Sequence, residues 1–92
     1  MTFVEKKTWY FDKPGPANTA DAAKFAVQRA EELKIQTILI ASTSGKTAEI
    51  FLEAMKGSNL DLVVVTHVVG FVKPGEWEFD AKTATRLRSN GV

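Results

Sequence analysis

Hydroxyl-bearing and cationic side chains are concentrated in one short stretch of the sequence, which comprises Ser42, Thr43, Ser44, Gly45, Lys46 and Thr47. An unbroken apolar run precedes it at residues 37–41, and apolar residues recur after it at three- and four-residue spacing. A strand, a turn and a helix in this order bring free backbone N–H groups and the positive end of the helix to one point. The sequence therefore predicts a phosphate-binding turn, the alternative being a turn whose Ser and Thr residues only cap the helix.

Two known phosphate-binding patterns can be compared with this turn. A Walker A loop needs a glycine five residues before the glycine of its Gly-Lys pair, and the corresponding position here holds Ile40. Nucleotide hydrolysis of the P-loop kind is therefore not expected. The spacing Ser42-x-Ser44-Gly45-x-Thr47 instead resembles the phosphosugar-binding turn of sugar isomerase domains, which also stands between a strand and a helix.

The single histidine, His67, is the candidate catalytic residue. It directly follows an apolar run that we interpret as a strand, and imidazole groups exchange protons near neutral pH. No partner for His67 is evident in the sequence, so a hydrogen bond to a ligand or to the loop backbone is the stronger interpretation. No second histidine and no close acidic cluster accompanies it, and we expect no metal site.

The remaining candidate ligand contacts lie in two other loops. Asn18 and Thr19 are expected to cap a helix and could also face a ligand, together with His67, Gly70 and Phe71. Phe71 and Trp77 could stack on a flat ring such as a flavin, or could hold their long loop against the body of the domain.

Composition limits the possible classes of function. The chain has 92 residues, enough for one domain, with ordinary contents of 45% hydrophobic and 25% charged residues. The net charge of +1 gives no reason to expect nucleic acid as a partner. No segment has the 18 or so apolar residues of a membrane span, and no signal peptide or cysteine is present, so we expect a cytoplasmic protein without membrane contact.

The predicted elements alternate between strands and helices. Strands are expected at residues 8–11, 37–41 and 60–66, and helices at about 19–34, 46–56 and 81–88, the last with Asp80 as its N-cap. Helical crossovers between strands predict a parallel sheet. The loops that follow its strands, residues 12–19, 42–47 and 67–79, then meet at one edge, where ligands bind in such folds.

Several separated blocks of the sequence resemble the stand-alone relatives of the pyruvate kinase C-terminal (alpha/beta) domain. The blocks are Tyr10-Phe11, Pro14-Gly15, Asn18-Thr19, Arg29-Ala30-x-Glu32-Leu33, Ala41-Ser42-Thr43-Ser44-Gly45-x-Thr47-Ala48 and Val64-Val65-Thr66-His67-x-x-Gly70-Phe71-x-x-Pro74-Gly75-x-x-Glu78-Phe79. The resemblance implies a three-layer α/β/α fold with a mainly parallel sheet. It also assigns the phosphate-holding role of the pyruvate kinase effector site to Ser42, Thr43, Ser44, Gly45 and Thr47.

Family members continue beyond the point where this sequence ends. Residues 1–92 are therefore expected to form a single domain of this type that is truncated relative to the family, as the N-terminal part of a longer domain. An open sheet edge would result, and a homo-oligomer formed through it is the expected assembly.

The leading hypothesis is a binding module for a phosphorylated small molecule, either a sugar phosphate or a mononucleotide cofactor such as FMN. The first alternative is an enzyme that acts on a phosphorylated substrate, similar to a sugar isomerase, with His67 as acid or base. The second alternative is an assembly domain that has no ligand.

Overall fold

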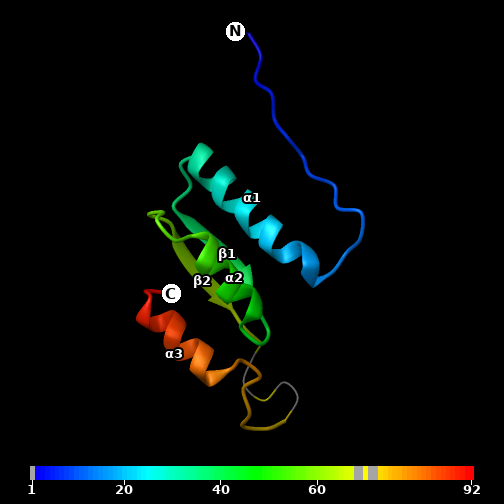
Figure 1. The fold of residues 1–92 in the computed structure, drawn as a ribbon. Coiled ribbons are helices and arrows are strands. Elements are labelled where there is room, and N and C mark those ends of the chain that lie inside the picture. The colour runs from blue at the N-terminus through cyan, green and yellow to red at the C-terminus, as the bar shows by residue number, and fades with distance from the viewer. Residues whose placement is uncertain (1, 68–69, 71–72) are drawn as a thin grey trace.

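The computed structural model describes residues 2–67, 70 and 73–92. A 3-10 turn at Pro16–Asn18 leads into helix α1, and the following elements alternate along the chain: α1 (Thr19–Glu32), β1 (Thr37–Ala41), α2 (Lys46–Ala54), β2 (Asp61–Val65) and α3 (Ala81–Ser89) (Figure 1). β1 pairs with β2 in parallel, with Thr37 opposite Asp61 and Ala41 opposite Val65. The predicted α/β class and the parallel sheet are thus confirmed.

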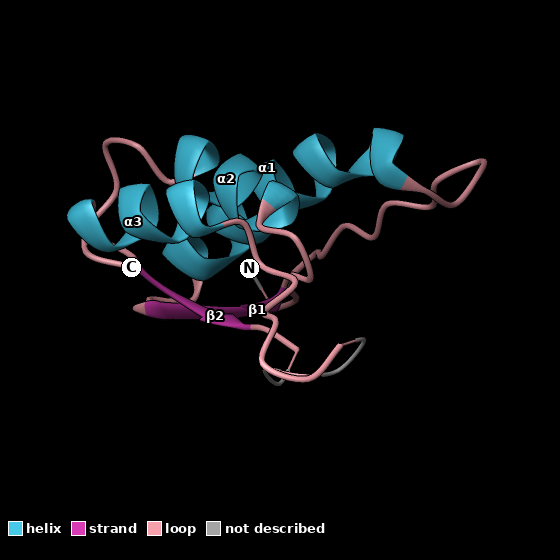
Figure 2. Cartoon of the chain, turned by 90° about the horizontal axis from the view of Figure 1, so that it is seen from below, coloured by secondary structure: helices cyan, strands magenta, loops and turns pink. Residues whose placement is uncertain are grey.

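In the described part of the chain, all helices lie on the same side of the sheet (Figure 2). The side chains of the opposite face point away from them, and Leu39, Val63 and Val65 are 66%, 45% and 52% exposed. The described residues therefore supply two layers of the expected α/β/α arrangement, one of helices and one of strands. They supply no helix for the second face of the sheet.

The strand expected at residues 8–11 is absent, and the prediction of three strands is wrong for the described residues, which contain two. The N-terminal segment instead runs back beside α1 without regular structure (Figure 1). The Trp9 ring packs on Phe25 of α1 with 4.4 Å between ring centroids. Aromatic residues favour strands chiefly because strands give them a surface to pack on, and here a helix provides that surface.

Two adjoining apolar clusters fill the space between the sheet and the helices. One joins α1 and α2 to β2 through Ala23, Val27, Phe51, Met55 and Leu62. The other fixes α3 against α2 through Ala48, Phe79, Ala84 and Leu87. Alanines on the facing sides of the helices permit close approach, and Ile40 and Val64 contact both clusters. No helix in the described ranges is both long and apolar enough to cross a bilayer.

Candidate functional site at the turn between β1 and α2

The turn between β1 and α2 is built around Ser42 and Gly45. Gly45 is the N-cap of α2 and has a left-handed backbone with φ of 109°. The buried Ser42 hydroxyl accepts a hydrogen bond from the Gly45 N–H at 3.1 Å, and the Ser42 N–H donates to the Val65 carbonyl at 3.0 Å. The sequence predicts that the Ser42 hydroxyl and the Gly45 N–H contact a ligand. In this structure they hold the turn to itself and to the end of β2.

The other side chains of the turn lie at its surface. Thr43, Ser44 and Lys46 are exposed, and Thr47 is half-buried. The Ser44 hydroxyl accepts from the Lys46 N–H at 3.4 Å, a long hydrogen bond that a stronger acceptor could replace. The first N–H groups of any helix have no partner within the helix, and they carry the positive end of its dipole. The surface of the turn is therefore suited to an anion.

One side of the turn is formed by the start of α3. The Asp80 N–H donates to the Ser44 carbonyl at 3.0 Å. A Cβ atom added to Gly45 would lie 2.8 Å from Thr83 Cγ2 and 3.0 Å from Phe79 Cζ. This contact was not foreseen from the sequence, because it joins residues that are more than thirty positions apart. It covers Gly45 and leaves Thr43, Ser44 and Lys46 open.

An acidic side chain, Glu49, lies in the first turn of α2. Glu49 Oε1 lies 3.1 Å from the Thr83 hydroxyl oxygen and forms an ion pair with Arg86 at 3.2 Å. The Arg86 cation offsets the negative charge that would otherwise oppose an anion at the turn. This pair also ties α2 to α3.

Asp80 caps α3 as the sequence predicts. Its carboxylate accepts from the Thr83 hydroxyl at 2.7 Å and from the Thr83 N–H at 2.9 Å. These hydrogen bonds, first that of the side chain and then that of the backbone, hold the pKa of Asp80 below its ordinary value of 3.8, with a smaller contribution from Lys82. Because the pKa is lowered in the folded state, the Asp80 charge stabilises the fold above that ordinary value.

We expect the Asp80→Asn variant to lose less stability on acidification than the wild type. The contribution of Asp80 is complete above its ordinary pKa and disappears as the pH falls through the lower value in the folded protein. Melting temperatures measured by circular dichroism from about pH 6 to about pH 2 test this, since the window follows from the depressed pKa. Asp12→Asn, in an exposed loop, is the matched control, and its melting temperature should change with pH as that of the wild type does. Parallel curves of melting temperature against pH for all three proteins would contradict the expectation.

His67 lies between two other side chains of the site. Its Nε2 is 3.5 Å from Thr43 Oγ1, and its Nδ1 is 3.3 Å from Glu78 Oε1. Glu78 is not among the site residues predicted from the sequence, because most glutamates are solvated. No local signal in the sequence indicated this contact, because it joins residues eleven positions apart across a loop.

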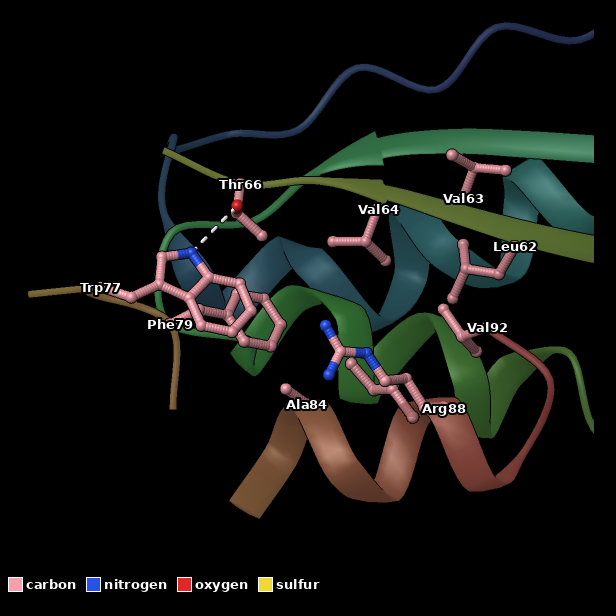
Figure 3. Close-up of a pocket in the computed structure, with 10 residues that line it drawn as sticks. Leu62, Val63, Val64, Thr66, Trp77, Phe79, Ala84, Arg88 and Val92 are labelled. Atoms are coloured by element: carbon pink, nitrogen blue, oxygen red, sulfur yellow. Dashed lines mark hydrogen bonds between the residues drawn. The ribbon is translucent and has the colours of Figure 1, made fainter. Parts of the chain in front are cut away.

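Trp77 fixes this loop to the end of β2. Its indole N–H donates to the Thr66 hydroxyl at 3.1 Å, and its ring stacks on Phe79 with 5.2 Å between centroids (Figure 3). Both rings line a cavity of about 300 Å³ between β2 and α3, toward which Arg88 points. No residue of the 42–47 turn lines that cavity. Trp77 therefore holds the loop against the domain, the second of the two roles considered for it.

The remaining predicted ligand contacts are not joined to the turn by any hydrogen bond within the described residues. Asn18 is the N-cap of α1, but its side chain donates to the Lys13 carbonyl and Thr19 begins the helix. The Gly70 N–H donates to the Glu76 carbonyl at 2.7 Å and so closes its own loop. Phe71 lies outside the described residues. Over the described ranges, no group of three or more His, Asp or Glu residues is placed to hold a metal ion.

The part of the sequence that forms most of α1 and all of β1, the turn, α2, β2 and α3 matches a known family. The family model described as pyruvate kinase, alpha/beta domain, matches residues 20–91. The chain belongs to this family. The matched range of the pyruvate kinase alpha/beta domain includes the whole 42–47 turn, His67 and Glu78, whereas Asn18 and Thr19 precede it. Gly70 and Phe71 also lie within the matched range.

Proposed function

We propose that this pyruvate kinase alpha/beta domain is a binding module for a phosphorylated small molecule and that it holds the phosphate at the 42–47 turn. The observation that carries the proposal is the exposure of Thr43, Ser44 and Lys46 over the first turn of α2. Helix N-termini that follow a strand are common anion sites because their N–H groups and dipole both favour negative charge. Sugar phosphates and mononucleotides such as FMN share the phosphate monoester that this chemistry recognises.

Three side chains of the turn have distinct parts in the proposed site. The Ser44 and Thr47 hydroxyls donate to phosphate oxygens, and the Lys46 ammonium supplies the charge. The N–H of Lys46 exchanges its 3.4 Å bond to Ser44 for a shorter one to the charged phosphate. Without an anion, Lys46 in the first turn opposes the helix dipole, and a bound phosphate removes that conflict.

We expect the Ser44→Ala/Thr47→Ala double variant to bind phosphorylated ligands at least tenfold more weakly than the wild type. Hydrogen bonds to a charged group contribute about 1.5–3 kcal/mol each, and a tenfold loss corresponds to about 1.4 kcal/mol. Isothermal titration calorimetry with inorganic phosphate, fructose 1,6-bisphosphate and FMN measures the affinity and identifies the preferred class of ligand.

The matched control removes the same hydroxyl types elsewhere. Thr85 and Ser89 are exposed on α3 and donate to carbonyls of their own helix. The Thr85→Ala/Ser89→Ala variant should therefore keep the wild-type affinity. Equal affinities for the wild type and both double variants would show that the turn is not the phosphate site.

A second function, self-assembly, is favoured by the uncovered face of the sheet. Parallel sheets are almost always covered on both faces, and here Leu39 lies beside Val63 in an exposed apolar surface. A second copy of the chain presents the same surface and can cover it with two-fold symmetry. We propose such a homodimer as the way in which the chain assembles.

We expect the Leu39→Lys/Val63→Lys variant to be a monomer under conditions in which the wild type is a dimer, because opposed ammonium groups repel each other across such an interface. Light scattering coupled to size-exclusion chromatography measures the mass. Val4→Lys, which changes a side chain that is 78% exposed in the N-terminal segment, is the control and should remain dimeric. A monomeric wild type at high concentration would contradict this second function.

A further inference from the structure

A hydroxyl, an imidazole and a carboxylate lie in series at the carboxyl edge of the sheet. Thr43 Oγ1 faces His67 Nε2 at 3.5 Å, and Glu78 Oε1 faces His67 Nδ1 at 3.3 Å. A nucleophile within reach of a base that a third group orients is the signature of covalent catalysis, and such distances are often long before substrate binds. We propose that Thr43 is the nucleophile of an esterase in which His67 is the base and Glu78 positions the imidazole.

The two ring nitrogens of His67 have different neighbours, and this assigns their roles. A carboxylate can only accept, so in the neutral tautomer that donates its Nδ1–H to Glu78, Nε2 carries the lone pair and can accept from the Thr43 hydroxyl. Thr43 is exposed, whereas 40% of the His67 side chain and 25% of the Glu78 side chain are accessible. The hydroxyl is thus open to a substrate while the carboxylate behind the imidazole is the most sheltered of the three groups.

The secondary structure places these groups as an acyl-transfer site requires. Thr43 stands in a sharp turn between β1 and α2, and His67 follows β2, the neighbouring parallel strand. A nucleophile between a strand and a helix lies beside the N–H groups of the helix N-terminus. These N–H groups can stabilise the negative charge that develops on a carbonyl oxygen during attack.

The reaction follows from these positions and needs only water as a second reactant. Thr43 Oγ1 attacks the carbonyl carbon of a small ester and forms a C–O bond, while its proton passes to His67 Nε2. The tetrahedral adduct breaks its bond to the alcohol oxygen, which takes that proton and leaves as the alcohol. Water, deprotonated by His67, then attacks the acyl-threonine, and the acid is released with the Thr43 hydroxyl restored.

The test uses the full chain and p-nitrophenyl acetate, a small activated ester. We expect an initial burst of p-nitrophenolate approaching one equivalent per chain, and peptide mass spectrometry should locate the acetyl group on Thr43. Thr43→Val should abolish the burst, Thr43→Ser should retain it, and His67→Gln should slow acylation by about 10²–10⁴-fold, the usual contribution of a general base. Thr85→Val, on the exposed face of α3, is the matched control and should behave as the wild type.

Glu78→Gln separates positioning from a structural role. It keeps the shape of the side chain but removes the carboxylate that orients the imidazole, so the acylation rate should fall while the KM for the ester and the circular dichroism stay unchanged. A burst that survives in Thr43→Val, an acetyl group found on Ser44 or Lys46 instead, or no burst with folded wild type would overturn the proposal. The proposed reaction of Thr43, His67 and Glu78 does not require phosphate binding. Calorimetry with inorganic phosphate on the His67→Gln variant therefore distinguishes a failure of the esterase proposal from a failure of the phosphate-binding proposal.

Discussion

The Phe79→Ala variant is expected to lose about 3–5 kcal/mol of its free energy of unfolding, the usual cost of removing a buried phenyl ring. Phe79 is 5% exposed and packs in one cluster with Ala48, Ala84 and Leu87. The same ring stacks on Trp77 and lies against Gly45. Its loss would therefore loosen α3, the 67–79 loop and the turn together.

Urea unfolding followed by circular dichroism measures this loss. Phe3→Ala removes the same ring from a position that is 60% exposed, and we expect it to change the free energy of unfolding by less than about 0.5 kcal/mol. If both variants unfolded at the same urea concentration, the packing of Phe79 described here would be wrong. Phe79→Leu, which fills part of the cavity, should fall between the two.

The Gly45→Ala variant is expected to be less stable than the wild type by about 2–5 kcal/mol. An L-residue with a left-handed backbone costs about 1–2 kcal/mol, and overpacking adds about 1–3 kcal/mol. Both penalties apply, because φ is 109° and the new methyl group would lie 2.8 Å from Thr83 Cγ2. The displaced helix start should also weaken phosphate binding at the adjacent hydroxyls.

Gly57 provides the control that separates these two penalties. It has a φ of 81°, but a Cβ at this position would meet no atom within 4 Å. Gly57→Ala should therefore cost only the backbone term, about 1–2 kcal/mol, and leave phosphate affinity unchanged. Equal losses of unfolding free energy for the two glycine variants, measured by urea unfolding, would show that Thr83 and Phe79 do not pack tightly against Gly45.

The helices and the parallel strands could be predicted from the sequence because their signals are local. The expected helix at 81–88 is found at Ala81–Ser89 with Asp80 as its cap, and the expected strand at 60–66 is found at Asp61–Val65. The expected strand at 37–41 has the same first and last residues as β1. Periodicity and capping depend on residues that are close in the sequence, so they can be recognised without knowledge of the tertiary structure.

The errors arose where tertiary contacts decide the outcome. Trp9 packs on Phe25 instead of joining the sheet, and local β preference cannot show which surface an aromatic ring will find. Glu78 reaches His67 because a loop returns to its starting edge, which no spacing rule indicates. The position of the hydroxyl-rich turn was readable from the sequence, but the contact of Gly45 with Phe79 and Thr83 was not.

The hydrogen bond from the Asp80 N–H to the Ser44 carbonyl joins the backbone of the turn directly to the N-cap of α3. If the proposed phosphate site is filled, a displacement of Ser44 reaches Asp80, the N-cap of α3, through this hydrogen bond, and a displacement of α3 reaches the turn by the same route. Any such coupling is reciprocal: a partner that contacts α3 would change the affinity of the turn for phosphate by the same factor by which bound phosphate changes the affinity for that partner. Because this hydrogen bond joins Ser44 to Asp80, we expect phosphate binding at the turn to be detectable as a change at the start of α3.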